Sequence, residues 1–348
     1  MKLKDHKNKI LLKGMTCESI KSWCQENSQP SFRANQIYQW MYRYGVKRAD
    51  DMTNISKELR SIINKKCILN TLEIEKVTTS KCKMTNKILF KTVDGKFVES
   101  VSMIDGKHHT ICISSQIGCN VDCDFCATAT MGLVRNLKVG EIVDQAIHIR
   151  SMVNSPITNV VFMGMGEPFL NYNRVMDAAD ILHEPNGFNL SSKRITISTS
   201  GVVPKIDQFA KEKRKFKLAI SLNASNDETR EKIMPINHKW PIQDLMKSVS
   251  NYSKQKNCQV MFEYVLLKDI NDSKQNAIEL AKLVKGFDCK LNIIPYNETN
   301  GIYKRPSNET IENFLKTLNK YRRDFRILVR WSKGEDIDAA CGQLAVKN

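Results

Sequence analysis

Long hydrophobic runs are missing from this 348-residue chain. A membrane-spanning helix needs about 18–20 consecutive apolar residues, and no segment approaches that length, so an integral membrane protein is excluded. The first 14 residues contain lysines, but their only apolar run is Ile10-Leu11-Leu12, which is too short for a secretory signal. We therefore expect a soluble, cytoplasmic protein with no membrane partner.

Glycine and proline are also scarce, at 15 and 9 residues, while 41% of the chain is hydrophobic. Disordered and fibrous chains have the opposite composition, so both classes are excluded. A chain of this length suggests roughly two domains and can bury a substantial core without disulfides.

Acidic side chains are in deficit, with 37 Asp+Glu against 54 Lys+Arg and a formal charge of +17. Residues 1–110 hold 21 of the basic and 11 of the acidic residues, so the excess is densest near the N-terminus. Such a charge favours an acidic partner, most often nucleic acid. The alternative is a surface of ordinary solvated lysines.

Cysteine, by contrast, is abundant, with 11 residues. An odd number without a secretory signal argues against a disulfide framework. Six cysteines are scattered and are expected to be small core or surface residues: Cys17, Cys24, Cys67, Cys82, Cys258 and Cys289. The other five lie where chemistry is expected: Cys112, Cys119, Cys123, Cys126 and Cys341.

The N-terminal part is predicted to be helical. Apolar residues recur at helical spacing in residues 33–44, and a second helix is expected over 53–63 with Thr53 as its N-cap. Together with the charge, this predicts a helical, basic RNA-binding accessory domain over residues 1–80.

The remainder is predicted to be α/β. Residues 81–104 form a β-rich connector with strand alternation, and residues 105–348 alternate short β-rich runs with helical stretches. That rhythm predicts a parallel sheet in a barrel or an open partial barrel. In barrels, functional residues lie on loops at the carboxyl ends of the strands.

The connector contains an unusual carboxylate. Strand alternation places Glu99 on the same face as Phe97, Val101 and Met103. One interpretation is an edge strand from which Glu99 reaches solvent. The other is a carboxylate with a raised pKa, suited to proton transfer.

The most specific motif is Cys119-Asn-Val-Asp-Cys123-Asp-Phe-Cys126, a C-x3-C-x2-C run after a strand. Three thiolates on one tight loop can hold three irons of a [4Fe–4S] cluster and leave the fourth iron open. The alternative is a structural zinc site completed by a distant Cys or His.

This spacing, with Phe125 before the last cysteine, resembles the signature of the radical S-adenosylmethionine (SAM) superfamily. The resemblance implies a partial (β/α)6 barrel whose open iron is chelated by SAM. The motif Gly164-Met165-Gly166-Glu167-Pro168 similarly resembles the loop that binds the SAM amine.

Three further segments narrow the resemblance: 114–119 (SSQIGC), 198–204 (STSGVVP) and 336–344 (DIDAACGQL). Together they resemble the RlmN/Cfr family of radical SAM RNA adenine methyltransferases over about residues 30–345. The resemblance implies methylation of adenine in 23S rRNA at the peptidyl-transferase centre. In the RlmN branch the product is 2-methyladenosine, formed also in the tRNA anticodon loop.

The resemblance also implies roles for individual residues. Two SAM molecules are used per turnover. Cys341 takes a methyl group from the first, and a radical generated from the second activates that methyl group for addition to adenine. Glu99 then removes the ring proton, and Cys112 attacks the Cys341 sulfur, leaving a transient Cys112–Cys341 disulfide.

The family's SAM contacts fall on seven residues of this chain: Gly166, Glu167, Ser198, Ser221, Leu222, Asn223 and Asn297. Many members have histidine where Asn223 stands, so a backbone or amide contact is expected there. The implied partners are 23S rRNA, tRNA and an electron donor such as flavodoxin or ferredoxin, and the protein is expected to be monomeric.

Two other functions remain as alternatives. One is the Cfr-type reaction, which methylates adenine at C8 and uses the same cysteines and glutamate. The segments 33–40 and 51–57 resemble RlmN more closely. The other is a non-catalytic RNA-binding protein with a structural metal site, which bound zinc would favour.

Overall fold

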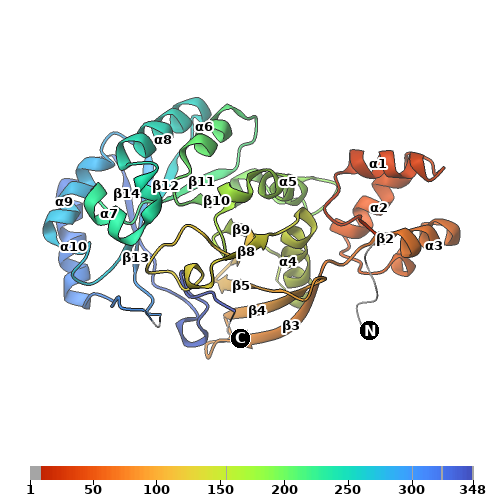
Figure 1. Ribbon diagram of the computed structural model, residues 1–348, viewed down its shortest axis with the longest axis horizontal. Helices are drawn as coiled ribbons and strands as arrows, with labels where there is room; N and C mark the ends of the chain where they lie inside the picture. The colour runs from red at the N-terminus through yellow and green to blue at the C-terminus, as the bar shows by residue number, and fades with distance from the viewer. Residues whose placement is uncertain (1–8, 154, 300, 323, 347–348) are drawn as a thin grey trace.

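The computed structural model describes residues 9–153, 155–299, 301–322 and 324–346. A helical lobe at the N-terminus projects from a larger α/β body (Figure 1). Residues 1–8 of the expected helical domain, and residues 154, 300, 323 and 347–348 of the expected barrel, lie outside the described part.

Three helices and a two-stranded parallel sheet form the lobe. Its elements are α1 (Cys17–Glu26), α2 (Arg33–Tyr42), α3 (Lys57–Lys66), β1 (Ile10–Leu11) and β2 (Cys67–Ile68). The expected N-cap at Thr53 is wrong: α3 starts after Ser56, whose hydroxyl accepts a hydrogen bond from the Leu59 amide at 3.3 Å. Ser56 also places acidic Glu58 in the first turn, which the helix dipole favours.

The body is built on one ten-stranded sheet. In chain order its strands are β3 (Leu72–Thr79), β4 (Thr85–Thr92), β5 (Phe97–Asp105), β6 (His108–Cys112), β9 (Asn159–Phe162), β10 (Ile195–Thr199), β11 (Lys217–Ser221), β12 (Val260–Leu266), β13 (Cys289–Pro295) and β14 (Arg326–Val329). Their spatial order is β14-β13-β12-β11-β10-β9-β6-β5-β4-β3. Neighbours from β6 to β14 pair in parallel, and β3 to β6 pair antiparallel.

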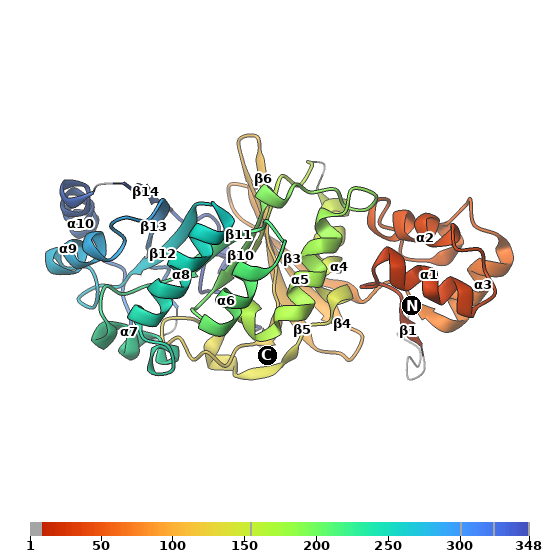
Figure 2. The same ribbon diagram turned by 90° about the horizontal axis from the view of Figure 1, so that it is seen from above.

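Each consecutive pair of parallel strands is joined through a helix that packs on the sheet. The helices are α4 (Val139–Met152), α5 (Tyr172–His183), α6 (Val203–Lys211), α8 (Ile242–Lys256), α9 (Lys274–Leu283) and α10 (Asn308–Tyr321), with the short α7 (Asp227–Ile233) before α8. Figure 2 shows α5, α6 and α8 side by side along the outside of the sheet. Strands covered in this way are largely buried, and every residue of β10 is buried although three of the five are Ser or Thr. The predicted partial (β/α)6 barrel is confirmed.

The boundary expected at residue 80 falls inside this sheet, because β3 pairs with β4. β3 is an edge strand, and its residues after Leu72 are mostly exposed. Leu72 and Ile74 alternate with glutamates, but a β-bulge between Ile74 and Lys76 interrupts this alternation, which is therefore too short to reveal the strand. The connector strands β4 and β5 likewise extend the barrel sheet and form no separate layer.

A buried ion pair ties the lobe to the body. Lys13 Nζ lies 3.2 Å from Asp144 Oδ1 of α4, and both side chains are almost fully buried. The backbone amide and the hydroxyl of Thr71 each donate to Asp144 Oδ2 at 2.6 Å. Across the part of the chain described, no helix is long and apolar enough to cross a membrane.

Candidate active site

The residues expected at the site follow the carboxyl ends of the parallel strands. Cys112 is the last residue of β6, Glu167 follows β9, and Asn297 follows β13. Ser198 is the last residue but one of β10, and Ser221 is the last residue of β11. Because parallel strands end at the same edge of a sheet, these residues gather at one mouth of the barrel.

The three motif cysteines lie on a loop between two short strands, β7 (Gln116–Gly118) and β8 (Leu133–Asn136). The Cys119 amide donates to Gly132 O at 3.0 Å and closes the loop at its base. Gly118 has φ +74°, and a Cβ there would lie 1.7 Å from Gly132 O, so only glycine fits this closure.

Burial raises the pKa of the Cys119 thiol to about 12 and that of Cys123 well above its ordinary value. Cationic iron would reverse this preference, since thiolates are the form that binds metal. Among the described residues, no group of three His, Cys, Asp or Glu side chains is arranged for a single ion. In a cube each thiolate binds a different iron, so three cysteines on one loop fit a [4Fe–4S] cluster.

Glu167 joins two neighbouring loops at the mouth. Its Oε1 accepts from the Phe169 amide at 2.9 Å and its Oε2 from the Ser200 amide at 2.7 Å. Burial raises its pKa, and these amides oppose the shift. Gly166, with φ +92°, lies so close to Gln116 that a Cβ would come within 2.4 Å of its side chain. The carboxylate keeps further lone pairs with which to accept from a ligand ammonium.

Among the residues that the structure describes, two buried side-chain oxygens on and after β13 have no hydrogen-bond partner: Asn292 Oδ1 and Asn297 Oδ1. Buried polar groups are normally satisfied, so orphans that follow or line the barrel strands indicate a polar ligand. They fit the polar groups of SAM.

The side chain of Asn223 forms hydrogen bonds within the protein. Its Oδ1 accepts from the Val265 amide at 3.0 Å, and its Nδ2 donates to Met234 Sδ at 3.3 Å. Its φ is +57°, a left-handed conformation that asparagine tolerates. The amide group expected to replace histidine is therefore already engaged within the protein, and Leu222 beside it is fully buried.

The C-terminal segment crosses this mouth and presents Cys341. Ala127, next to the last cluster cysteine, donates its amide to Gly342 O at 2.8 Å, and Asn297 Nδ2 donates to Cys341 O at 3.1 Å. Thr128 Oγ1 donates to Leu344 O at 2.6 Å. These bonds join residues more than 40 positions apart in the chain.

Both expected catalytic cysteines are free thiols. The Cys341 side chain is exposed, yet the protein atoms around its sulfur displace water and raise its pKa to about 12. The charge of Cys112 contributes to this increase, and burial alone raises the pKa of Cys112 to about 12. The two sulfurs therefore lie within electrostatic reach of each other.

Glu99 is buried beneath the same segment. Its Oε2 accepts from the Ala345 amide at 3.1 Å, and Lys87 Nζ lies 3.5 Å from its Oε1. Burial raises the pKa of Glu99, and Lys87 opposes this. The edge-strand interpretation is wrong, because β5 runs between β4 and β6 and Glu99 is only 5% exposed.

Sequence patterns gave no signal for Lys87 or for Arg230. Lys87 lies on β4 and also donates to Asp338 O at 3.3 Å, so it contacts both Glu99 and the C-terminal segment. Arg230 lies in the ordinary charged helix α7 and yet is fully buried. Only long-range contacts distinguish these two from surface lysines and arginines.

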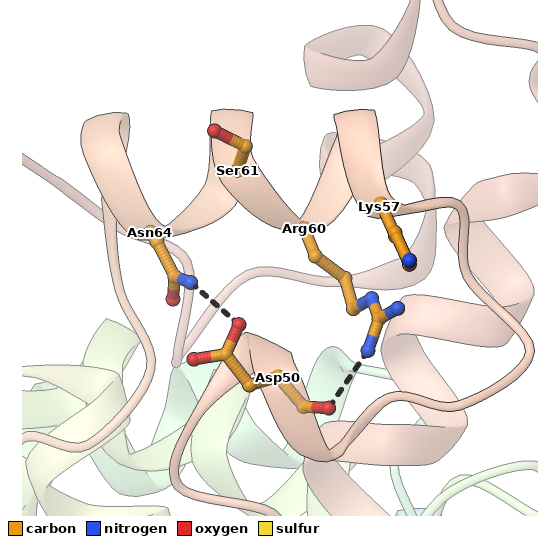
Figure 3. A pocket seen from close by; sticks show the side chains of 5 residues that line it. All are labelled: Asp50, Lys57, Arg60, Ser61 and Asn64. Atoms are coloured by element: carbon orange, nitrogen blue, oxygen red, sulfur yellow. Dashed lines mark hydrogen bonds between the residues drawn. The ribbon is translucent and has the colours of Figure 1, made fainter.

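A separate surface pocket lies on the helical lobe, formed by α3 and η1 (Ala49–Asp51) (Figure 3). Lys57 and Arg60 reach towards it, and Arg60 Nη1 donates to Asp50 O at 2.9 Å. Asn64 Nδ2 donates to Asp50 Oδ1 at 3.0 Å. This pocket contains none of the predicted catalytic residues.

Comparison with known proteins agrees with this geometry. Residues 113–281 match the radical SAM superfamily, and residues 10–69 match the ribosomal RNA large subunit methyltransferase N-terminal domain.

Several curated relatives are named probable dual-specificity RNA methyltransferase RlmN. The one from Bacillus licheniformis is 41% identical over 95% of this chain and 92% of its own. The one from Thermoanaerobacter pseudethanolicus is 42% identical over 97% of this chain and 98% of its own. A solved radical SAM methyltransferase from Sphaerobacter thermophilus is 41% identical, with a TM-score of 0.92 over 96% of this chain and 98% of that one. The chain therefore belongs to the RlmN family of radical SAM methyltransferases.

Proposed function

We propose that this protein forms 2-methyladenosine in 23S rRNA, at the peptidyl-transferase centre, and in the anticodon loop of tRNA. The observation that supports this most strongly is the path of the C-terminal segment. It presents Cys341 at the barrel mouth while hydrogen-bonding the cluster loop through Ala127 and Glu99 through Ala345. A thiol, an iron-binding loop and a buried carboxylate thus meet at one place.

Cys119, Cys123 and Cys126 hold the [4Fe–4S] cluster in this proposal. The cluster, when bound with SAM, supplies the electron that cleaves SAM and so provides a radical. Gly166, Glu167, Ser198, Ser221 and Asn297 hold SAM at the barrel mouth, where the unpartnered Asn292 Oδ1 adds a further polar contact.

A radical route suits the target atom. Adenine C2 is an electron-poor carbon between two ring nitrogens and cannot attack a SAM methyl group as an ordinary nucleophile. Cys341 instead accepts the methyl group on sulfur and carries its carbon to C2. This reaction needs the exposed position of Cys341 at the mouth.

Two other side chains complete the reaction. Glu99, kept basic by burial, removes the ring proton from C2, and the unpaired electron of the adduct would return to the iron–sulfur site that had supplied one electron. The Cys112 thiolate then attacks the Cys341 sulfur, the sulfur–carbon bond breaks, and its electron pair remains on the carbon, which is protonated to the methyl product. A Cys112–Cys341 disulfide remains and must be reduced before the next turnover.

The RNA has to deliver an unstacked base to this mouth, so the target adenine is flipped out of its stack. The basic lobe binds the rest of the RNA through its phosphates, and Lys57 and Arg60 of α3, which line the surface pocket, are candidates for this contact. The protein acts as a cytoplasmic monomer and receives electrons from a donor of the flavodoxin or ferredoxin type.

The test is anaerobic turnover with SAM, a reductant and unmodified 23S rRNA and tRNA fragments. Nucleosides from the digested RNA are compared by mass spectrometry with both methyladenosine standards. We expect 2-methyladenosine from both RNAs. 8-Methyladenosine confined to rRNA would move the protein to the Cfr-type reaction, and neither product from cluster-loaded protein would overturn the catalytic assignment.

A further inference from the structure

Arg230 is among the largest fully buried side chains of the residues that the structure describes. Its guanidinium fastens the ends of two barrel strands: Nη2 donates to Ser200 O at 2.6 Å and to Ser221 O at 3.4 Å, and Nε donates to Leu222 O at 3.1 Å. Nη1 donates to Asn237 Oδ1 at 2.9 Å. Every one of these acceptors is an uncharged oxygen.

No carboxylate among the residues that the structure describes forms an ion pair with this guanidinium. Asp227 contacts Arg230 only through Asn237, whose side-chain amide lies between them and donates to Asp227 Oδ1 at 2.8 Å. Burial lowers the pKa of Arg230 to about 10, which leaves it charged at neutral pH. A buried charge without a counter-ion is strongly unfavourable, so a negative partner is expected nearby.

The cluster loop supplies that partner. The Asp124 amide donates to Ile233 O at 3.0 Å, so the loop sits directly on the end of α7, one turn from Arg230. Cys123 packs in the same apolar cluster as Ile233 and Met234.

We propose that Arg230 is a positioning residue that provides a fixed counter-charge to the anionic iron–sulfur site and thereby favours reduction of the cluster. The inference rests on the proposed binding of iron by the three loop cysteines. Reduction adds one electron to the site, and a cation held in a low-dielectric surrounding stabilises the added negative charge. The hydrogen bonds to Ser200, Ser221 and Leu222 prevent the cation from moving away when the charge changes.

The measurement is a redox titration of the reconstituted protein, followed by electron paramagnetic resonance of the reduced cluster. Arg230→Gln removes the charge and keeps hydrogen-bonding groups, and Arg230→Lys keeps the charge as the matched control. We expect the equilibrium constant for reduction to fall about tenfold in Arg230→Gln, which is about 59 mV for one electron. Arg230→Lys should stay within about twofold of the parent.

Asp227→Asn gives an independent result if Arg230→Gln fails to fold. It preserves an Oδ1 acceptor for Asn237 and the Ile242 amide, and it removes a negative charge that partly neutralises Arg230. Its cluster should therefore be easier to reduce than that of the parent. An unchanged equilibrium constant in folded Arg230→Gln, or an unchanged or smaller one in Asp227→Asn, would overturn the inference. A parent protein that binds no iron would instead overturn the proposed function.

Discussion

At the scale of single residues, Glu99 has the chemistry that depends most on its surroundings. Glu99→Gln keeps the shape and an acceptor for the Ala345 amide but cannot remove a proton. We expect 2-methyladenosine formation to fall by about 10²–10⁴-fold, the usual contribution of a general base. RNA binding, measured by filter retention, should stay unchanged; equal loss of binding and turnover would contradict a role in proton transfer.

The ion pair with Lys87 sets the pH range in which Glu99 can act. Burial raises the pKa of Glu99 and Lys87 lowers it, so Lys87→Met should raise that pKa further. Because the ionised carboxylate is the active form, the acidic limb of the pH–rate profile should move to higher pH. Lys91→Met, on the same strand, is the control. A limb that stays in place would show that Glu99 is not the base.

Cys112 is predicted to act only after the RNA has been attached to Cys341. In Cys112→Ala the sulfur–carbon bond cannot be broken by thiolate attack, so RNA should remain covalently bound to the enzyme. A denaturing gel that separates free from protein-bound RNA measures this directly. Cys258→Ala, a change at a half-buried thiol, should release product normally. Release by Cys112→Ala at the parental rate would assign resolution to another group.

At the scale of elements, closure of the cluster loop between β7 and β8 depends on Gly118. In Gly118→Ala the new Cβ would collide with Gly132 O and the loop base would open. We expect iron and sulfide per chain to fall severalfold after anaerobic reconstitution. Gly106→Ala is the matched control, since Gly106 also has a positive φ, +54°, but meets nothing within 4 Å. Full iron loading in Gly118→Ala would show that the loop tolerates opening.

At the scale of the whole molecule, the Lys13–Asp144 pair joins the helical lobe to the barrel. Lys13→Met would leave Asp144 buried without its counter-charge, at a cost of about 3–5 kcal/mol in the free energy of unfolding. Chemical denaturation measures this loss. Lys232→Met removes the ion pair with Glu228, in which the two side chains are 67% and 82% exposed, and should leave the free energy of unfolding almost unchanged. Equal effects would mean that the buried pair does not hold the lobe.

The sequence alone determined the features that depend on neighbours along the chain. Local spacing along the chain was enough to identify the cluster cysteines, the Gly164–Pro168 motif and the alternation of strands and helices. Each of these features forms from residues that are close together in the sequence. The start of a helix and the position of an edge strand were less certain. Thr53 shows the first case, because hydroxyl residues before a helix are common. β3 shows the second, because a β-bulge after Ile74 interrupts its apolar alternation.

Tertiary structure decided everything that depends on distant partners. The same alternation allowed Glu99 to reach solvent or to be buried, and the pairing of β5 between β4 and β6 made it buried. Cys112 and Cys341 are 229 positions apart. The C-terminal segment, hydrogen-bonded to the cluster loop, brings Cys341 within electrostatic reach of Cys112. Arg230 has the sequence context of a surface residue, and its burial follows from the packing of α7 under the loop. Burial and electrostatic reach are properties of the packed chain, so no local pattern specifies them.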